Sequence, residues 1–162
     1  MWATMRALTS TKPGAAASTY STTIPAGSAT DFINKFSAAA ENIQRLYAIP
    51  AKFTLAQGGL ESGWGTSYLA KNANNLFGVK ADSSWKGPVF TTRDGLRYRK
   101  YSSAAESFKD RAEFLTRNQR YEKAFDHSDA VMFAKAVAAA GYAEDPNYAE
   151  KLSSIISTIQ LV

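Results

Sequence analysis

The chain contains no cysteine and only one histidine, His127, among its 162 residues. The absence of cysteine excludes disulfide bonds, thiolate metal ligands and a cysteine nucleophile. With one histidine, a zinc centre would have to depend almost wholly on carboxylates. A Ser-His-Asp triad would have to use His127, which precedes Ser128 and Asp129 in a segment typical of a surface loop. We therefore expect neither a metal ion nor a cofactor.

Long apolar runs are also lacking, since no stretch approaches the ~20 residues that a membrane-spanning helix needs. Acidic residues are fewer than basic ones, with 14 Asp and Glu against 19 Lys and Arg, so the formal net charge is +5. This charge favours a polyanionic partner, such as nucleic acid, anionic lipid or the bacterial wall, without choosing among them. The length and the 45% hydrophobic content indicate one globular domain.

The first 28 residues are rich in Thr, Ser, Ala, Pro and Gly. This composition predicts a flexible N-terminal arm at residues 1–28, followed by a single folded domain at residues 29–162. The arm lacks the sustained apolar core of a Sec signal peptide, and Arg6 is its early charge.

Helical periodicity dominates the rest of the chain. Thr30 or Asp31 is expected to cap a first helix that ends before Pro50, and a buried helix then runs from Pro50 to the glycines at 63 and 65. Further helices are expected at residues 67–71, after Ser103, around residues 121–125, after Asp129 with Gly141 as terminator, and from Pro146 onward. In the helix after Asp129, Met132 is among the residues expected to pack inward.

A β-hairpin is predicted between residues 89 and 101, with Asp94-Gly95 at its reversal. Its second strand alternates basic and aromatic side chains, a pattern that fits an RNA-stacking surface or a two-faced strand. The second interpretation is commoner and places Leu96, Tyr98 and Lys100 on one side. We expect no nucleic-acid partner and a predominantly α, α+β fold with one small hairpin.

The segment Leu60-Glu61-Ser62-Gly63-Trp64-Gly65 places one carboxylate beside an indole where an apolar helix meets glycines. A carboxyl group packed against apolar surface loses hydration of its charged form, so its pKa rises and it can act as an acid near neutral pH. The commoner interpretation of a Glu is a solvated helix residue. Gly58 and Gly59 each cost roughly 1 kcal/mol relative to Ala inside a helix, a cost accepted where something approaches the backbone closely.

Three segments, residues 60–67, 74–80 and 141–149, resemble in order and spacing the endo-β-N-acetylglucosaminidase domain of glycoside hydrolase family 73. The similarity is greatest to the muralytic domain of flagellar rod-associated peptidoglycan hydrolases, and it spans residues 30–160. It implies a lysozyme-like domain that cleaves the β-1,4 bond after N-acetylglucosamine in peptidoglycan. A muramidase or a lytic transglycosylase on the same fold, and a non-catalytic peptidoglycan-binding module, are the alternatives.

The resemblance implies that Glu61 is the general acid. The family places a second carboxylate after two threonines of the hairpin, where this chain has Asp94 in a shorter hairpin; a hairpin turn also selects Asp before Gly. If Asp94 does not reach the substrate, the acetamido oxygen of the sugar can attack the anomeric carbon, with Tyr142 as the stabilising group.

A groove for an amphipathic glycan should offer aromatic faces with polar groups between them. The aromatic candidates are Trp64, Phe77, Trp85, Tyr142 and Tyr148, and the polar candidates are Asn75 and Lys80. Packing in the core is the commoner role for Phe77.

The resemblance implies action on peptidoglycan glycan strands in the bacterial periplasm or cell wall. Because no Sec signal is seen, we expect export by a dedicated secretion system or a phage route, as for an antibacterial type VI secretion effector or a lysin. An effector implies an immunity protein that occludes the cleft. We expect the chain to be monomeric.

Overall fold

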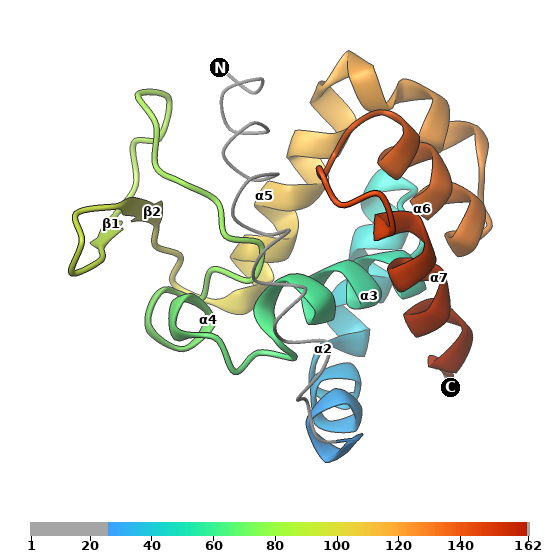
Figure 1. The fold of residues 1–162 in the computed structure, drawn as a ribbon, viewed down its shortest axis with the longest axis horizontal. Coiled ribbons are helices and arrows are strands. Elements are labelled where there is room, and N and C mark those ends of the chain that lie inside the picture. Colours follow the sequence, from blue (N-terminus) through green and yellow to red (C-terminus); the bar gives the residue numbers. More distant parts are fainter. Residues whose placement is uncertain (1–25, 162) are drawn as a thin grey trace.

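The computed structural model describes residues 26–161 and shows a body of helices from which one small hairpin projects (Figure 1). The elements are α2 (Ala26–Tyr47), α3 (Ala51–Ser62), α4 (Tyr68–Ala73), β1 (Val89–Thr91), β2 (Arg97–Arg99), α5 (Ala104–Arg117), the 3₁₀ helix η1 (Gln119–Asp126), α6 (Ala130–Ala139) and α7 (Tyr148–Thr158). The expected class, α+β with mostly helix, is confirmed. Most of the predicted arm, residues 1–28, lies outside the described residues.

The central element is α3, which lies against α2, α6 and α7. Pro50 precedes its first turn, and every residue of the helix except Lys52 is buried. A helix that is apolar on all sides has to be surrounded by other elements, and this explains why α3 occupies the middle of the core. Glu61 therefore stands at the end of the most enclosed helix that the structure describes.

The first helix begins earlier than expected. Its residues run from Ala26 rather than from a cap at Thr30 or Asp31, so residues 26–28 belong to α2 and not to the arm. The end of α2 before Pro50 agrees with the prediction.

The hairpin pairs β1 and β2 in antiparallel register, with Val89 opposite Arg99, and reverses at Asp94 and Gly95 as predicted. The predicted side of its second strand is only partly covered. Leu96 is exposed, whereas Tyr98 and the adjacent Arg99 are both buried. Both faces of β2 are covered because the guanidinium of Arg99 is held among carboxylates and an indole on the face opposite Tyr98.

The helices α5 and α6 begin with polar caps as expected, whereas α7 begins at Tyr148 rather than at Pro146 and has no side-chain cap. Ser103 Oγ accepts from the N–H of Glu106 at the start of α5, and the Glu106 carboxylate in turn accepts from the N–H of Ser102. Asp129 caps α6, but Met132 is 43% exposed and does not pack inward as expected, because it projects from the first turn beyond the core. Among residues 26–161, no helix is both long and apolar enough to cross a bilayer.

Candidate active site

Glu61 lies in the last turn of α3 and its exposed fraction is 6%. The helix ends directly after it, because Gly63 adopts a left-handed conformation with φ of 60° and donates its N–H to the carbonyl of Gly59. Ser62 Oγ donates to the carbonyl of Gly58 and accepts from the N–H of Gly65. The end of α3 thus holds the carboxylate in a fixed and largely dry position.

The double glycine of α3 makes room for aromatic rings, as the sequence indicated. A Cβ at Gly59 would overlap the six-membered ring of Trp64, and one at Gly58 would lie 3.2 Å from Phe108 and 3.3 Å from Phe32. Trp64 itself has a φ of 56°, a left-handed conformation that is costly for a residue with a side chain. Its ring also packs edge-on against Phe32, with centroids 5.6 Å apart.

Tyr148, at the start of α7, completes the surroundings of the carboxylate. Its hydroxyl donates to Glu61 Oε2 over 2.7 Å and accepts from Gln57 Nε2 over 3.2 Å. Gln57 and Glu61 are one turn apart on the same face of α3, so both reach the same hydroxyl. Burial raises the pKa of Tyr148 well above its ordinary value, and the neighbouring Glu61 acts in the same direction. Tyr148 therefore remains a hydrogen-bond donor throughout the pH range in which enzymes work.

Tyr142 lies beside this group, fully buried, with its ring stacked on that of Tyr148 at 5.6 Å. Burial raises its pKa well above the ordinary value, Arg111 opposes that rise and Glu61 adds to it. Arg111, from α5, lies 4.9 Å from the Tyr142 ring and 4.8 Å from the Phe77 ring. The structure thus brings Glu61, Tyr142 and Tyr148 together, with Phe77 beyond them in the core.

Asn75 is buried, and backbone groups occupy its side chain. Its Nδ2 donates to the carbonyls of Val79 and Arg99, and its Oδ1 accepts from the N–H of Val79. These bonds fasten the loop after α4 to the hairpin. Substrate contacts by Asn75 and Phe77 stay predictions, and the geometry gives both residues a structural role.

The remaining candidates lie on or beside the hairpin. Lys80 is partly buried and pairs with Tyr98 in an isolated antiparallel bridge. Trp85 is partly exposed, donates its Nε1–H to the carbonyl of Pro88 and carries the Arg99 guanidinium 4.8 Å from its ring. Asp94 is exposed in the turn, where it accepts from the hydroxyl of Thr92.

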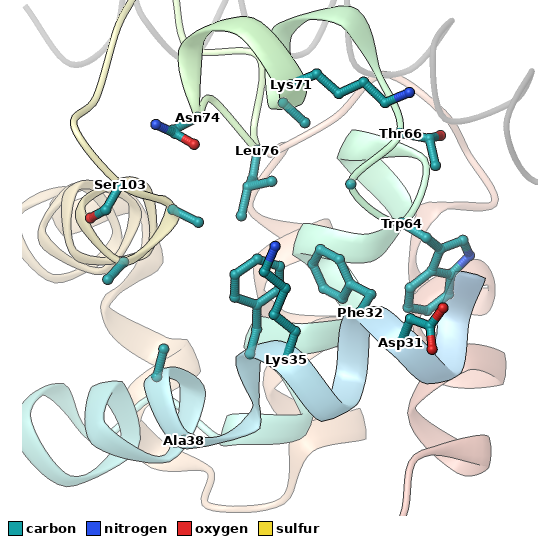
Figure 2. A pocket seen from close by; sticks show the side chains of 16 residues that line it. Asp31, Phe32, Lys35, Ala38, Trp64, Thr66, Lys71, Asn74, Leu76 and Ser103 are labelled. Carbon is teal, nitrogen blue, oxygen red and sulfur yellow. The ribbon is translucent and has the colours of Figure 1, made fainter. Parts of the chain in front are cut away.

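A pocket of about 870 Å³ lies between α2, α4 and the start of α5. Figure 2 shows Phe32 and Trp64 along one wall and Ser103 on the opposite wall, with the Lys35 side chain reaching between them. Glu61 does not line this pocket. The Trp64 ring, which does, packs against Gly59. Gly59 and Glu61 are two residues apart on α3, so they lie on nearly opposite sides of the helix. We take Glu61 and not the pocket as the candidate site, because no buried carboxyl group lines the pocket.

Gln57 and Arg111 were not identified from the sequence. Gln57 could have been found from its position one turn before Glu61 on a helix that is otherwise apolar around it. Arg111 interrupts the apolar face formed by Phe108, Ala112 and Leu115, which is an unusual place for a charge. The described residues contain no group of three His, Cys, Asp or Glu side chains arranged to hold a metal ion.

The chain is similar to proteins of known class. It is 38% identical over 149 residues to the peptidoglycan hydrolase FlgJ of Salmonella typhimurium, covering 83% of this chain and 47% of that protein. It is 36% identical over 146 residues to the exo-glucosaminidase LytG of Bacillus subtilis, covering 80% of this chain and 51% of that protein. The chain therefore spans about half the length of these curated relatives.

Solved structures agree on the fold. The glycoside hydrolase domain of Salmonella typhimurium FlgJ superimposes with a TM-score of 0.72 at 42% identity, over 80% of this chain and 86% of that domain. A type VI secretion effector from Pseudomonas protegens, solved as an effector-immunity complex, shares the fold at 24% identity and a TM-score of 0.63, over 80% of this chain and 89% of that chain. The expected lysozyme-like architecture is thereby confirmed. The chain belongs to the glucosaminidase family, glycoside hydrolase family 73, whose model, described as mannosyl-glycoprotein endo-beta-N-acetylglucosaminidase, matches residues 37–161.

Proposed function

We propose that the chain hydrolyses the β-1,4 bond after N-acetylglucosamine in bacterial peptidoglycan, with Glu61 as the general acid. The observation that carries this proposal is the buried Glu61 carboxyl group, which accepts from Tyr148 at the end of α3. The membership of the chain in the glucosaminidase family supports the substrate class. The site of action is then the bacterial cell wall or periplasm.

The hydrogen bond from Tyr148 determines how Glu61 can act. Glycoside cleavage requires a proton on the leaving oxygen while positive charge builds on the anomeric carbon. Because Glu61 Oε2 accepts from the Tyr148 hydroxyl, a proton on this carboxyl group resides on Oε1. Oε1 is thus the atom that would carry the acid proton; it is buried in the structure, so a bound glycan has to open this surface to receive the proton, and Tyr148 then stabilises the carboxylate that remains.

Glu61→Gln tests the acid directly. This variant keeps the shape of the side chain but removes its acidic proton, so clearing of a wall suspension should fall by about 10²-fold to 10⁴-fold. Glu150→Gln, on the exposed side of α7, is the matched control and should clear at the wild-type rate. Near-normal clearing by the Glu61 variant, with an unchanged fold by circular dichroism, rules the proposal out.

The bond that is cleaved is tested separately by the products. Released fragments, reduced and analysed by mass spectrometry, should carry N-acetylglucosamine at the new reducing ends. N-acetylmuramic acid at those ends indicates a muramidase, and anhydro ends indicate a lytic transglycosylase. Binding to wall material without any product identifies a non-catalytic module.

We propose Asp94 as the second catalytic carboxylate, with participation of the substrate acetamido group as the alternative route. The hairpin supports the first by presenting Asp94 in an exposed turn, where a bound glycan strand can meet it. The buried Tyr142 beside the acid is consistent with the second, since it could orient the groups that stabilise the transition state.

Asp94→Asn separates these routes. A loss of more than about 10³-fold in kcat assigns the ionised carboxylate a chemical role, because a missing nucleophile or base has effects of that size or larger. A loss below tenfold assigns Asp94 to the turn and leaves the acetamido route. Asp126→Asn, at the exposed end of η1, serves as the control.

We further propose that the chain acts as an antibacterial toxin that an immunity protein inhibits by covering the cleft. The type VI secretion effector from Pseudomonas protegens, solved as an effector-immunity complex, has the same fold and motivates this proposal. Expression with an added periplasmic signal should lyse cells, whereas cytoplasmic expression and Glu61→Gln should not. Equal toxicity in both compartments contradicts this role.

A further inference from the structure

Arg111 has an unusual environment for a charged side chain. It is 4% exposed, and its guanidinium lies 4.8 to 4.9 Å from the rings of Phe77, Phe114 and Tyr142. None of its three side-chain nitrogens has a hydrogen-bond partner among the described residues. Aromatic faces stabilise the positive charge but do not satisfy the five N–H groups of a guanidinium. Buried groups of this kind nearly always have a partner, which in many proteins is an ordered water molecule.

A small cavity adjoins the same side chain. Its volume is about 10 Å³, and Arg111, Gln57 and Thr54 line it together with apolar residues of α2, α3 and α5. This is about the smallest space that holds one water molecule. Gln57 is completely buried, and its Oε1 also lacks a hydrogen-bond partner among the described residues. Two residues that line the cavity, Arg111 and Gln57, therefore carry buried polar atoms without a partner among the described residues.

The two polar groups are complementary to water and not to an ion. Arg111 can only donate hydrogen bonds, and the Gln57 Oε1 atom can only accept them. A water molecule between them accepts from the guanidinium and donates to the amide oxygen. A chloride ion would suit Arg111 but would face the lone pairs of Gln57 Oε1.

We propose that this cavity holds one ordered water molecule that joins Arg111 to Gln57, and that Arg111 thereby acts as a positioning residue for Glu61. The inference rests on the proposed role of Glu61 as the acid. With its oxygen directed to the water, Gln57 presents its Nε2 to Tyr148, as observed at 3.2 Å. The single hydroxyl proton of Tyr148 is then directed to Glu61 Oε2, as observed at 2.7 Å.

The direction of this chain of hydrogen bonds has a chemical consequence. If the Gln57 amide were reversed, its oxygen would compete with Glu61 for the one proton of Tyr148. Glu61 Oε2 would lose the hydrogen bond from Tyr148, and this bond would no longer direct the acid proton to Oε1. Arg111 can only donate hydrogen bonds, and its place at the start of this series of hydrogen bonds prevents the Gln57 amide from reversing. Tyr142 interacts electrostatically with both Glu61 and Tyr148. It also interacts with Arg111 and Tyr121.

A crystal structure of the wild-type protein at a resolution that shows ordered solvent tests the bridge directly. We expect one water molecule within hydrogen-bond distance of Gln57 Oε1 and of an Arg111 nitrogen. A second crystal soaked in bromide should show no anomalous peak at this position. Bromide in the cavity, or no density there, overturns the proposal, and neither result depends on any variant folding or on Glu61 being the acid.

Kinetics of Arg111→Met tests the positioning role, with Arg117→Met at the exposed end of the same helix as the control. We expect kcat to fall about 10-fold to 100-fold with little change in KM, and the basic limb of the pH profile to move to higher pH. The limb moves upward because the Glu61 carboxylate loses hydrogen-bond and charge stabilisation, which favours its protonated form. Arg117→Met should leave both unchanged.

Gln57→Leu, alone and combined with Arg111→Met, shows whether the two residues act through one series of hydrogen bonds or have separate structural effects. If Arg111 acts through Gln57, the double variant should lose no more activity than the worse single variant. Arg111→Lys, which can still donate to the water, should recover most of the activity and the normal pH profile. Additive losses, or a fall in kcat with an unmoved basic limb, would overturn the positioning role. If Glu61→Gln is fully active, the proposed function fails, and the crystallographic test of the water still stands.

Discussion

The Tyr148 hydroxyl lies 2.7 Å from Glu61 Oε2, although 87 positions separate the two residues in the sequence. The contact joins the first turn of α7 to the last turn of α3, so the docking of two helices positions the acid. Both residues are nearly inaccessible to solvent. A hydrogen bond to a charged group in such a place is worth about 1.5 to 3 kcal/mol, enough to govern how the carboxyl group titrates.

Tyr148→Phe should therefore shift the pH dependence of catalysis. The variant removes the donor that stabilises the Glu61 carboxylate, and 1.5 to 3 kcal/mol corresponds to about one to two pH units. We expect the basic limb of the kcat profile to move upward by that amount and kcat to fall roughly tenfold. Tyr68→Phe, at a side chain that is 66% exposed, is the control. An unmoved basic limb in the Tyr148 variant would contradict this account.

Gly59→Ala should destabilise the protein more than Gly58→Ala. Both substitutions gain about 1 kcal/mol of helix propensity. A Cβ at position 59 overlaps the Trp64 ring, for which overpacking costs about 1 to 3 kcal/mol, whereas at position 58 the neighbouring rings need to move only slightly. Urea unfolding should show a net loss of up to about 2 kcal/mol for Gly59→Ala and no net loss for Gly58→Ala.

A double variant checks the cause of that loss. Gly59→Ala combined with Trp64→Ala removes the ring that the new methyl group meets, so the two effects should be less than additive. Full additivity would show that the methyl group at position 59 is harmful for a reason other than the indole.

Arg99→Met should be far more harmful than Arg97→Met on the same strand. Arg99 is 2.9 Å from Asp110 and 3.6 Å from Asp82, and all three side chains are largely buried. Removing one partner leaves carboxylates uncompensated, which costs about 3 to 5 kcal/mol. Arg97 is exposed, and its replacement should change the free energy of unfolding by less than about 0.5 kcal/mol. Equal effects of the two substitutions in urea unfolding would refute the structural role of Arg99.

Alkaline pH should destabilise the fold through its buried tyrosines. Burial, with a smaller contribution from Asp94, raises the pKa of Tyr98 to about 12, and burial also raises the pKa values of Tyr142 and Tyr148. In the unfolded chain these groups titrate near pH 10. The stability that they contribute is therefore complete below about pH 10 and is lost as the pH rises toward 12.

Thermal unfolding at a series of pH values measures this effect. The buried tyrosines should leave Tm nearly unchanged from pH 8 to 10, and Tm should fall steeply at higher pH. Tyrosinate absorbance should develop together with the loss of structure. Tyrosines that all titrate near pH 10 in a protein that stays folded would contradict the observed burial.

The sequence predicted the elements whose signals are local. The period of apolar residues located α3 and α5, and Asp94-Gly95 located the reversal of the hairpin, because the residues that define these features are neighbours in the chain. Glu61 was predicted to be the acid because it lies between an apolar helix and a glycine-rich segment; the structure shows its burial, and its role stays a prediction. These inferences needed no knowledge of the tertiary arrangement.

Features that depend on distant partners were not predictable. Lys100 and Arg99 are both basic residues in an alternating strand, and only the carboxylates of Asp82 and Asp110 determine that Arg99 is the buried one. In the same way, Arg111 is identified as part of the site by three rings that come from different elements.

The order of the chain gives the contact between α3 and α7 a consequence for biosynthesis. Glu61 leaves the ribosome long before Tyr148 does, so a nascent chain carries the acid without the phenol that orients it. A ribosome-bound or C-terminally truncated product that stops before Pro146 has an incomplete acid site. Competence to act as proposed would then require α7 as well as α3.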